Sequence, residues 1–579
     1  MLKTTIAMLL TAAIAMGVHA APDDEVRLTL IETSDVHGNF FPYDFLAGGK
    51  PGNGSLARAA TYIDSLRQAR GDDSVILLDN GDILQGQPTA YYYNFIDTTA
   101  THLCADVLNY MRYDAITVGN HDIEAGHDVY ARWVRECRMP VLAANAIRCE
   151  DGEPYFKPYT IIERRGIRVA VLGMITTGIP QWVPKNLWEG MEFKAIEDIA
   201  NRYMPRLRNE ADVVVGLFHS GMGNPERYTP LGESVAEAIA RRVPGFDIIF
   251  CGHDHRIANR TVVNSEGGRT LILNPGANAD ALAQAEITLH RDSANGITTM
   301  HVGGKHIALS QQKPSKTFMK RFEAPCKAVR DFVTQKVGRS RATMDTRPSA
   351  FGPSAFVDFI HEMQLQISGA EISFAAPLAF DATIARGHIT VADVFNLYRY
   401  ENMLYVMELS GREIKDYLEF SYDGWTQQMT SPDDHLLRFR SDAASLTEPQ
   451  QRLQTPNFNF DSAAGIRYTV DVRQPRGSRI TILGMADGRP FSPDSTYRCA
   501  LNSYRGNGGG RHLTEGAGIA ADSLEDRIVW RSDRDLRYYM MQYIRQQGTV
   551  SPKALGLWKF IPEDWARKAR KADEELLWK

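Results

Sequence analysis

Five short segments of this sequence combine aspartate, asparagine and histidine in patterns that could bind metal ions. Taken alone, each segment is an ordinary turn or helix cap, and a single histidine is often a core residue. Their joint occurrence, each time directly after an apolar strand-like run, indicates a metal site. The segments are Asp35-Val36-His37-Gly38, Asp79-Asn80-Gly81-Asp82, Gly119-Asn120-His121-Asp122, His219-Ser220-Gly221 and Cys251-Gly252-His253-Asp254-His255.

The donor groups in these segments indicate which metals would bind and what the metals would do. Aspartate carboxylates, an asparagine carbonyl and imidazoles form a mixed nitrogen and oxygen set without thiolates, which suits zinc, manganese, cobalt or iron. If one carboxylate bridges two such ions about 3.5–4 Å apart, the pair can bind the attacking and leaving oxygens of a displacement at phosphorus. The ions also lower the pKa of a bound water. The sequence therefore predicts a two-metal hydrolytic centre.

The elements that must position these residues form an α/β pattern between Val26 and Arg291. Several strand-like runs are apolar at consecutive positions, as strands buried on both faces must be. Helical spacing lies between them, as in residues 55–69, where Ser55 is the expected N-cap. Open α/β sheets place their sites at the carboxyl ends of strands, so the five segments should meet in one crevice. The predicted strands are residues 26–31, 75–78, 115–118, 169–174, 213–218, 247–250 and 270–273.

The metal-binding segments resemble the motif set of the calcineurin-like metallophosphoesterases. Four later stretches (354–374, 389–413, 459–468 and 502–510) resemble the carboxy-terminal substrate domain of secreted 5′-nucleotidases and 2′,3′-cyclic-nucleotide 2′-phosphodiesterases. The resemblance implies an α/β protein with an N-terminal β-sandwich flanked by helices (αββα) and a C-terminal α/β substrate-binding domain. We expect the domains at 22–310 and 342–562, a linker helix at 311–341 and a charged, solvated helical tail at 563–579.

The resemblance also implies a role for each matching residue. Asp35, His37 and His255 should hold the first of two divalent ions, and Asp82 should bridge to the second. Asn120, His219 and His253 should complete the second site.

Two further residues should take part in catalysis without binding metal. His121 should face the phosphoryl group and stabilise charge or protonate the leaving oxygen. Glu124 stands where an aspartate that orients this histidine is more common, and the alternative for Glu124 is an exposed carboxylate at a helix start.

The second domain is expected to choose the substrate. In this family a base stacks between two aromatic rings, and the matching positions are Tyr400 and Tyr504. Stacking tolerates any base, which predicts a broad nucleotide range. Asn402 could hydrogen-bond the base. The alternative for all three residues is packing in the core.

One departure from the family bears on the reaction. Typical 5′-nucleotidases carry an Asn-Gly-Gly-x-Arg segment that supplies arginines to the terminal phosphate, whereas residues 373–378 here read Ser-Phe-Ala-Ala-Pro-Leu, with Arg386 as the nearby guanidinium. We therefore predict a 2′,3′-cyclic-nucleotide 2′-phosphodiesterase with 3′-nucleotidase activity, and 5′-nucleotidase as the alternative. A non-catalytic metal- or nucleoside-binding protein, a surface interaction protein and a nucleotide-sugar or sulfate-ester hydrolase are more distant alternatives.

Composition and the amino terminus bound the remaining possibilities. The 579 residues carry a formal net charge of −5, which argues against binding of nucleic-acid polymers. Residues 1–20 combine a lysine, a short apolar run and a small-residue end, as in a cleaved signal peptide, so a periplasmic or extracellular location without a membrane anchor is expected. Six scattered cysteines exclude a disulfide scaffold, although Cys137 and Cys149 could pair. We expect a monomer.

Overall fold

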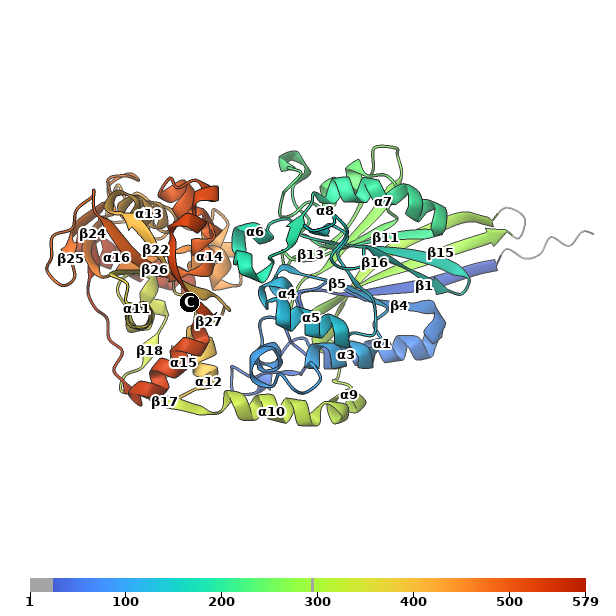
Figure 1. The fold of residues 1–579 in the computed structure, drawn as a ribbon, viewed down its shortest axis with the longest axis horizontal. Helices are drawn as coiled ribbons and strands as arrows, with labels where there is room; N and C mark the ends of the chain where they lie inside the picture. The colour runs from blue at the N-terminus through green and yellow to red at the C-terminus, as the bar shows by residue number, and fades with distance from the viewer. Residues whose placement is uncertain (1–23, 293–295, 579) are drawn as a thin grey trace, which may run out of the picture.

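The computed structural model describes residues 24–292 and 296–578, which form two α/β units joined by a helical connection (Figure 1). The predicted signal peptide lies outside the described residues. Within these two stretches no helix has the length and apolar character needed to cross a membrane. All six cysteines lie in the described stretches, and none of them, including Cys137 and Cys149, forms a disulfide.

The first unit is a sandwich of two six-stranded sheets with helices on both outer faces, as predicted. In sheet order the first has β16 (Gly296–Ala308), β15 (Ala281–Asp292), β1 (Asp24–Thr33), β4 (Val75–Asp79), β5 (Ala115–Thr117) and β6 (Val141–Leu142). The second has β13 (Ile257–Val263), β14 (Arg269–Pro275), β12 (Ile248–Cys251), β11 (Val213–His219), β9 (Ile167–Ile175) and β8 (Tyr159–Arg164). All seven predicted strands are present.

The pairing of these strands explains why the site residues meet. Strands β1, β4, β5 and β6 run parallel, and so do β9, β11, β12 and β14. Alternate apolar residues such as Leu28 and Val171 fill the space between the sheets, while Ile31 and Leu172 face the helices. The helices are α1 (Leu56–Arg70), α3 (Leu103–Met111) and α5 (His127–Glu136) on one face, and α7 (Ile196–Glu210) and α8 (Ala236–Arg242) on the other. The carboxyl ends of both parallel sets therefore open toward the second unit (Figure 1).

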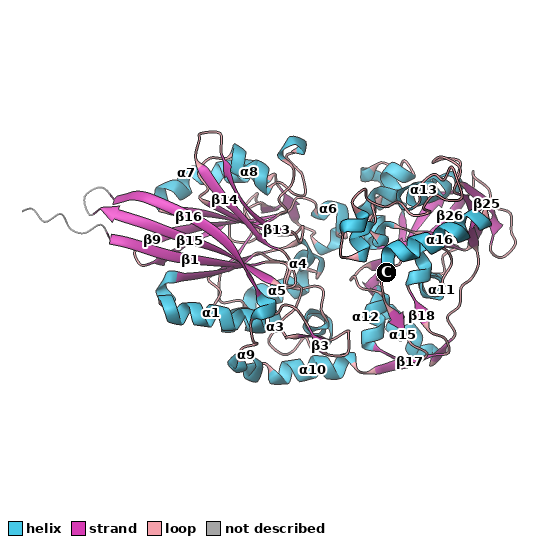
Figure 2. Cartoon of the chain, turned by 180° about the vertical axis from the view of Figure 1, so that it is seen from behind, coloured by secondary structure: helices cyan, strands magenta, loops and turns pink. Residues whose placement is uncertain are grey.

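The connection between the units differs from the single linker helix that we predicted. It consists of α9 (Lys316–Arg321) and α10 (Glu323–Val333), which meet at the buried Phe322 and run along one edge of the molecule (Figure 2). The strand β17 (Lys336–Ser340) follows and pairs with β21 (Gly387–Thr390) and β28 (Thr549–Val550). The sequence did not reveal this strand, because its partners come from distant parts of the chain.

The second unit is built on a mixed five-stranded sheet. The order is β23 (Ser462–Ala464), β19 (Ile372–Ala375), β26 (Thr496–Asn502), β22 (Met403–Ser410) and β27 (Ile528–Asp535). A three-stranded sheet adds β25 (Ile480–Met485), β24 (Ile466–Asp471) and β29 (Trp558–Ile561). The main helices are α11 (Ala355–Ser368), α12 (Val391–Leu397), α13 (Gly411–Trp425), α15 (Leu536–Gln547) and α16 (Glu563–Trp578).

The charged tail forms a helix, α16, but it is not only a solvated face as we expected. Asp573 is fully buried, and its Oδ2 accepts hydrogen bonds from the backbone N–H groups of Leu436 (3.0 Å) and Leu437 (2.8 Å). Leu577 and Ala569 pack into the core of the second unit. The tail is therefore an integral part of this unit.

Candidate metal centre

The loops that carry the predicted ligands have an unusual backbone. Left-handed conformations are uncommon for residues other than glycine and cost roughly 1–3 kcal/mol each, so they persist where the surrounding structure enforces them. Five of the seven predicted metal ligands adopt positive φ angles, between 51° and 69°: Asp35, His37, Asp82, His253 and His255. Such clustering of strained residues is typical of functional sites.

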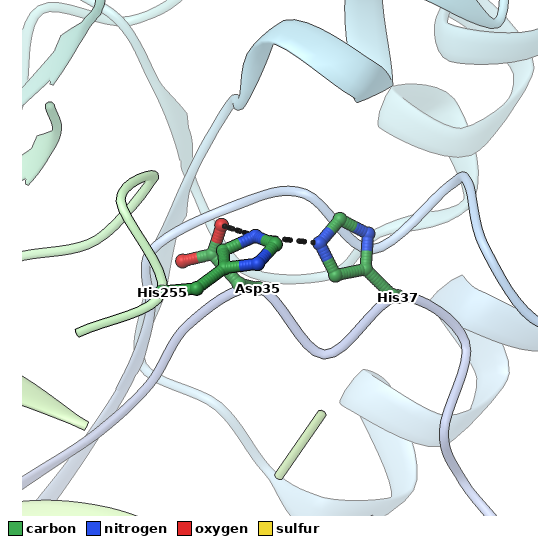
Figure 3. A group of neighbouring side chains, drawn as sticks. All are labelled: Asp35, His37 and His255. Atoms are coloured by element: carbon green, nitrogen blue, oxygen red, sulfur yellow. Dashed lines mark hydrogen bonds and ion pairs between the residues drawn. The ribbon is translucent and has the colours of Figure 1, made fainter. Parts of the chain in front are cut away.

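The first group of converging side chains contains Asp35, His37 and His255, whose donor atoms lie within 4.8 Å of one another (Figure 3). The Nδ1 atom of His37 is 3.0 Å from the carbonyl oxygen of Gln85, and a hydrogen bond there leaves Nε2 as a lone-pair donor. This Nε2 lies 3.1 Å from Nε2 of His255. Oδ1 of Asp35 is buried, and although His255 Nε2 is 3.2 Å away, it receives no well-directed hydrogen bond. An unsatisfied carboxylate oxygen within 4.8 Å of two imidazole nitrogens fits a cation.

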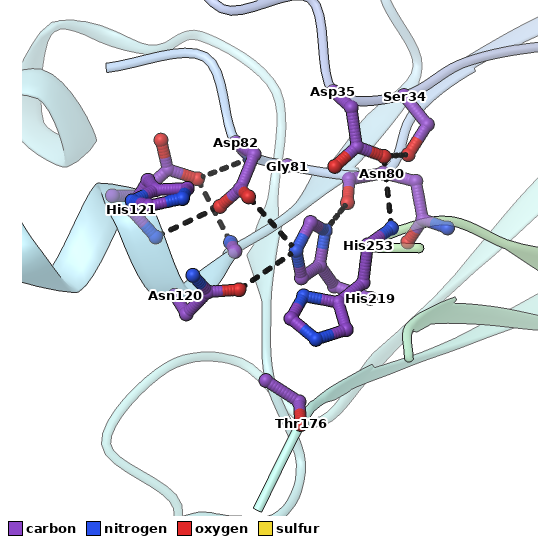
Figure 4. Close-up of polar contacts among 12 residues, drawn as sticks. Ser34, Asp35, Asn80, Gly81, Asp82, Asn120, His121, Thr176, His219 and His253 are labelled. Carbon is purple, nitrogen blue, oxygen red and sulfur yellow. Dashed lines mark hydrogen bonds and ion pairs between the residues drawn. The ribbon is translucent and has the colours of Figure 1, made fainter. Parts of the chain in front are cut away.

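The second group contains Asp82, His219 and His253 (Figure 4). The Nδ1 atom of His219 lies 2.6 Å from the carbonyl oxygen of Asn80, which orients the ring. Its Nε2 is 3.2 Å from Oδ2 of Asp82 and 3.2 Å from Oδ1 of Asn120. Three groups with lone pairs thus face one point, as the second predicted metal site requires.

The two groups adjoin one another. The backbone N–H of His253 donates to Oδ2 of Asp35 (2.9 Å), so a residue of the second group supports a residue of the first. Asp82 is buried, and its Oδ1 accepts from the backbone N–H of His121 (2.8 Å). The structure therefore brings all seven predicted ligands to one place at the ends of the strands.

The two aspartates at this place carry negative charge inside the protein. Burial by itself would raise the pKa of Asp35, but the nearby His219 and His255 outweigh it and lower the pKa to about 2. Burial opposes ionisation of Asp82 as well, yet His219 and His121 hold its pKa well below the usual range. Both carboxylates are therefore anionic inside the protein, and divalent cations would compensate them.

His121 and Glu124 lie on the short helix α4 (Asn120–Glu124) and contact each other. The Nδ1 atom of His121 is 2.6 Å from Oε2 of Glu124, and the side-chain amide of Gln85 donates to the same oxygen (2.8 Å). Burial alone would lower the pKa of His121, but the charge of Asp82 and the hydrogen bond to Glu124 raise it to about 9. A protonated imidazole beside the ligand groups can donate a proton.

Sequence reasoning gave Asp122 no role, and the structure gives it a central one. Its buried carboxylate accepts hydrogen bonds from the backbone N–H groups of Asp82 (2.9 Å), Ile83 (2.9 Å), Leu84 (2.9 Å) and Gly119 (2.8 Å). It therefore ties the loop after β4 to the loop after β5. The available signal was its position three residues after Gly119 at a helix start, where a carboxylate caps backbone N–H groups.

Close packing of these two loops also explains one glycine. A Cβ atom at Gly119 would lie 2.0 Å from Oδ1 of Asp82 and 2.5 Å from the Asp82 nitrogen. Any side chain at this position would displace the predicted bridging carboxylate.

A cavity of about 310 Å³ connects this centre to the second unit. Asn120, His121, Glu124 and His253 line it from the first unit, and all three predicted substrate-binding residues, Tyr400, Asn402 and Tyr504, line it from the second. The ring of Tyr400 is partly exposed, whereas Asn402 is buried with Nδ2 3.4 Å from the Tyr398 hydroxyl.

Two aromatic residues of this cavity were not predicted. Phe458 contacts Tyr400 edge to face at 6.1 Å, and Trp182 stacks on His253 at 5.5 Å. Neither residue lies in a motif, so only the folded chain shows that they belong to the cavity.

Family models match both units. Residues 28–256 match the calcineurin-like phosphoesterase domain, and residues 334–515 match the 5′-nucleotidase C-terminal domain. A solved structure, a 5′-nucleotidase precursor from Thermus thermophilus, shares the fold, with a TM-score of 0.62 and 22% identity over 93% of this chain and 100% of that one.

Two curated relatives match nearly the whole chain in sequence. One is the 2′,3′-cyclic-nucleotide 2′-phosphodiesterase/3′-nucleotidase of Yersinia enterocolitica, which is 25% identical over 95% of this chain and 90% of its own. The other is the trifunctional nucleotide phosphoesterase protein YfkN of Bacillus subtilis (strain 168), which is 26% identical over 94% of this chain. The chain spans only 39% of that second relative's length. The chain thus belongs to the calcineurin-like phosphoesterases that carry a 5′-nucleotidase C-terminal domain, and it is a hydrolase of phosphate esters.

Proposed function

We propose that the protein is an exported two-metal 2′,3′-cyclic-nucleotide 2′-phosphodiesterase with 3′-nucleotidase activity. The observation that carries this proposal is the cavity that joins His121, Asn120 and His253 to Tyr400, Asn402 and Tyr504. A phosphoryl group beside the imidazoles and a base between the tyrosines would occupy the two ends of one cavity. The names of the relatives described above support a nucleotide substrate.

Seven residues would hold the metals. One set would be Asp35, His37 and His255, the other would be Asn120, His219 and His253, and Asp82 would bridge the two ions. When bound, two divalent ions supply charge stabilisation to the phosphoryl oxygens and lower the pKa of the attacking water. The nitrogen-rich donor set favours zinc, manganese, cobalt or iron.

His121 would act on the leaving group. With Glu124 on Nδ1, the Nε2 edge of His121 is free to give a proton to the leaving 2′-oxygen as the bond from phosphorus to that oxygen breaks. Water supplies the oxygen that phosphorus gains, and a 3′-nucleotide results. A second hydrolysis at the same centre would release the nucleoside and phosphate.

The second unit would select the nucleoside. Tyr400 and Tyr504 would stack on the two faces of the base, a contact worth about 1–3 kcal/mol that accepts any base. Asn402 would add a hydrogen bond to the base edge.

The test is a comparison of substrates by enzyme reconstituted with each metal. We expect kcat/KM to be highest for a 2′,3′-cyclic nucleotide, followed by the 3′-nucleotide, with the 5′-nucleotide clearly lower. Preference for the 5′-nucleotide would establish the alternative, a 5′-nucleotidase, which the match to the 5′-nucleotidase C-terminal domain favours. Metal binding without hydrolysis of any phosphate ester would indicate a binding protein.

Export and oligomeric state have their own tests. We infer export from the signal-peptide pattern of residues 1–20, and cell fractionation with amino-terminal sequencing of the mature protein would test it. We propose a monomer, which light scattering would test.

A further inference from the structure

A second cavity, of about 580 Å³, reaches the candidate metal centre from the side of the first ligand group. His37 and His255 of that group line it, together with His121 and Tyr400, which also line the first cavity. A phosphoryl group at the centre would therefore be accessible from both cavities. The nucleoside would leave one side of this group exposed to the second cavity.

Most charged side chains that line the second cavity already have a partner, and one has none among the described residues. Asp381 forms a bidentate ion pair with Arg347 (2.8 and 2.9 Å). The Oδ1 atom of Asp44 accepts from the backbone N–H groups of Leu46 (2.7 Å) and Ala47 (3.2 Å). Both carboxylates of this cavity are thus already compensated.

Arg399 is the unmatched residue. It is exposed, and no ion pair or hydrogen bond engages its guanidinium within the described residues. It is also the single lysine or arginine among the described residues that line the two cavities. By contrast Arg386, the guanidinium that the sequence suggested, is exposed and lines neither cavity.

We propose that Arg399 is a specificity-determining residue that binds the non-bridging oxygens of the substrate phosphate from the second cavity. This proposal rests on the proposed function and extends it to the second half of the reaction. A guanidinium forms charge-assisted hydrogen bonds whose strength grows with the negative charge of the oxygens. Arg399 would thus take the part that the Asn-Gly-Gly-x-Arg segment plays in typical 5′-nucleotidases.

The proposal separates two classes of substrate by charge. A cyclic or acyclic phosphodiester is a monoanion, whereas a phosphomonoester is largely a dianion at neutral pH. Arg399 would favour the dianion, so it would chiefly assist the step that removes phosphate from the 3′-nucleotide.

Charge-selective kinetics of metal-loaded enzyme test this role. The substrates are 3′-AMP against 2′,3′-cyclic AMP, and p-nitrophenyl phosphate against bis(p-nitrophenyl) phosphate. The variants are Arg399→Met, Arg399→Lys and, as a matched control, Arg386→Met. For Arg399→Met we expect the monoester-to-diester ratio of kcat/KM to fall about 10- to 100-fold, the range of one hydrogen bond to a charged group. The ratio for Arg399→Lys should lie between those of the wild type and Arg399→Met, because the lysine keeps a positive charge but lacks the planar guanidinium. The ratio for Arg386→Met should match that of the wild type.

Two measurements besides turnover follow from the exposure of Arg399. Calorimetry should show weaker binding of inorganic phosphate to Arg399→Met. The monoester KM of the wild type should rise with ionic strength more steeply than that of Arg399→Met, because an exposed charge is screened by salt.

If Arg399→Met lowered kcat/KM equally for monoesters and diesters, or lowered it for neither, the proposed role of Arg399 would be wrong. Because the aryl phosphates carry the same charge difference without a nucleoside, this result does not depend on cyclic-nucleotide hydrolysis. Failure of the enzyme on 2′,3′-cyclic AMP alone would count against the proposed function and leave the aryl comparison decisive for Arg399.

Discussion

Nδ1 of His121 lies 2.6 Å from Oε2 of Glu124, three residues further along the same short helix. This contact fixes the imidazole and stabilises its protonated form. The carboxylate of Glu124 does not simply point into solvent, because it faces the histidine and accepts a hydrogen bond from the side-chain amide of Gln85.

Substitution of this pair should separate catalysis from metal binding. His121→Asn should lower kcat about 100- to 10,000-fold, the range of lost general acid catalysis. Glu124→Gln should lower kcat about 10- to 100-fold, because it removes a charge-assisted hydrogen bond to His121. Glu124→Asp is the matched conservative variant and should retain more activity than Glu124→Gln. Metal analysis should find wild-type metal content in all three, and a loss of metal would instead make the pair part of the metal site.

Asp82 should control the occupancy of both metals. Asp82→Asn keeps the shape of the side chain but removes the charge that two cations would share, so metal content should fall from two ions per chain to one or fewer. Activity should drop by at least about 1000-fold, since the electrostatic stabilisation by the metals is lost. Plasma mass spectrometry of the purified variant measures this, with the exposed Asp416→Asn as control. Two tightly bound ions in Asp82→Asn would contradict a bridging role.

Tyr400 and Tyr504 of the first cavity should affect the KM of nucleotide substrates but not that of a phosphate ester without a nucleoside. Tyr400→Ala or Tyr504→Ala should raise the KM for nucleotides about tenfold or more, as one lost stacking contact implies. Tyr400→Phe should be close to the wild type, because the ring face is retained. The KM for p-nitrophenyl phosphate serves as the internal control. A parallel rise in that KM would mean that the substitutions disturb the centre itself.

A buried ion pair stands beside the substrate-binding loop. The Nη2 atom of Arg537 lies 2.6 Å from Oε1 of Glu401, and both side chains are shielded from solvent. The guanidinium also stacks on Tyr91 (4.7 Å) of the first unit and on Phe395 (4.2 Å). The buried Asp535 also faces this guanidinium, with Oδ1 3.7 Å from Nε of Arg537. Arg537→Met should therefore remove the cation from two buried carboxyl groups and destabilise the protein by about 3–5 kcal/mol.

The double variant Arg537→Met/Glu401→Met provides the matched comparison. It should recover part of the loss, because Glu401 no longer carries a buried charge, whereas the buried Asp535 still lacks its cation. Urea unfolding measures all variants. Equal losses in the single and double variants would show that the ion pair with Glu401 is not what makes Arg537 stabilising.

Two buried histidines should make the stability of the second unit depend on pH. Burial lowers the pKa of His361 to about 3, and burial together with the charge of Arg505 lowers the pKa of His512 to about 3. Both are neutral in the folded protein at pH 5, whereas the unfolded chain binds a proton on each below its ordinary pKa of about 6.5. The free energy of unfolding therefore has its full value above pH 6.5. It decreases as the pH falls from 6.5 toward 3, by about 1.4 kcal/mol per pH unit for each histidine.

Denaturation between pH 7.5 and 5 measures this slope. His361→Gln should reduce it, and the exposed His301→Gln should leave it unchanged. Because Ser373 and Ser462 contact the ring nitrogens of His361, the variant should also lose some stability at pH 7.5. An unchanged slope in His361→Gln would place the proton uptake elsewhere.

The sequence alone predicted the architecture of the first unit and the residues that meet at the candidate metal centre. Buried parallel strands leave a strong apolar signal, and the residues after them, such as Asp35 and His219, are read directly from their positions. The same local logic predicted α1 from its spacing and from Ser55, which caps the helix by accepting from the backbone of Arg58.

Only the tertiary structure decided what depends on contacts between distant segments. The strand β17 exists because β21 and β28 flank it, and Asp573 is buried because the backbone of Leu436 and Leu437 requires an acceptor. In the sequence Arg386 is the guanidinium near the altered segment, whereas in the folded chain Arg399 lines a cavity that imidazoles of the candidate centre also line. Local periodicity and residue type carry no information on which remote side chain shares a cavity, since that is fixed by packing of the whole chain.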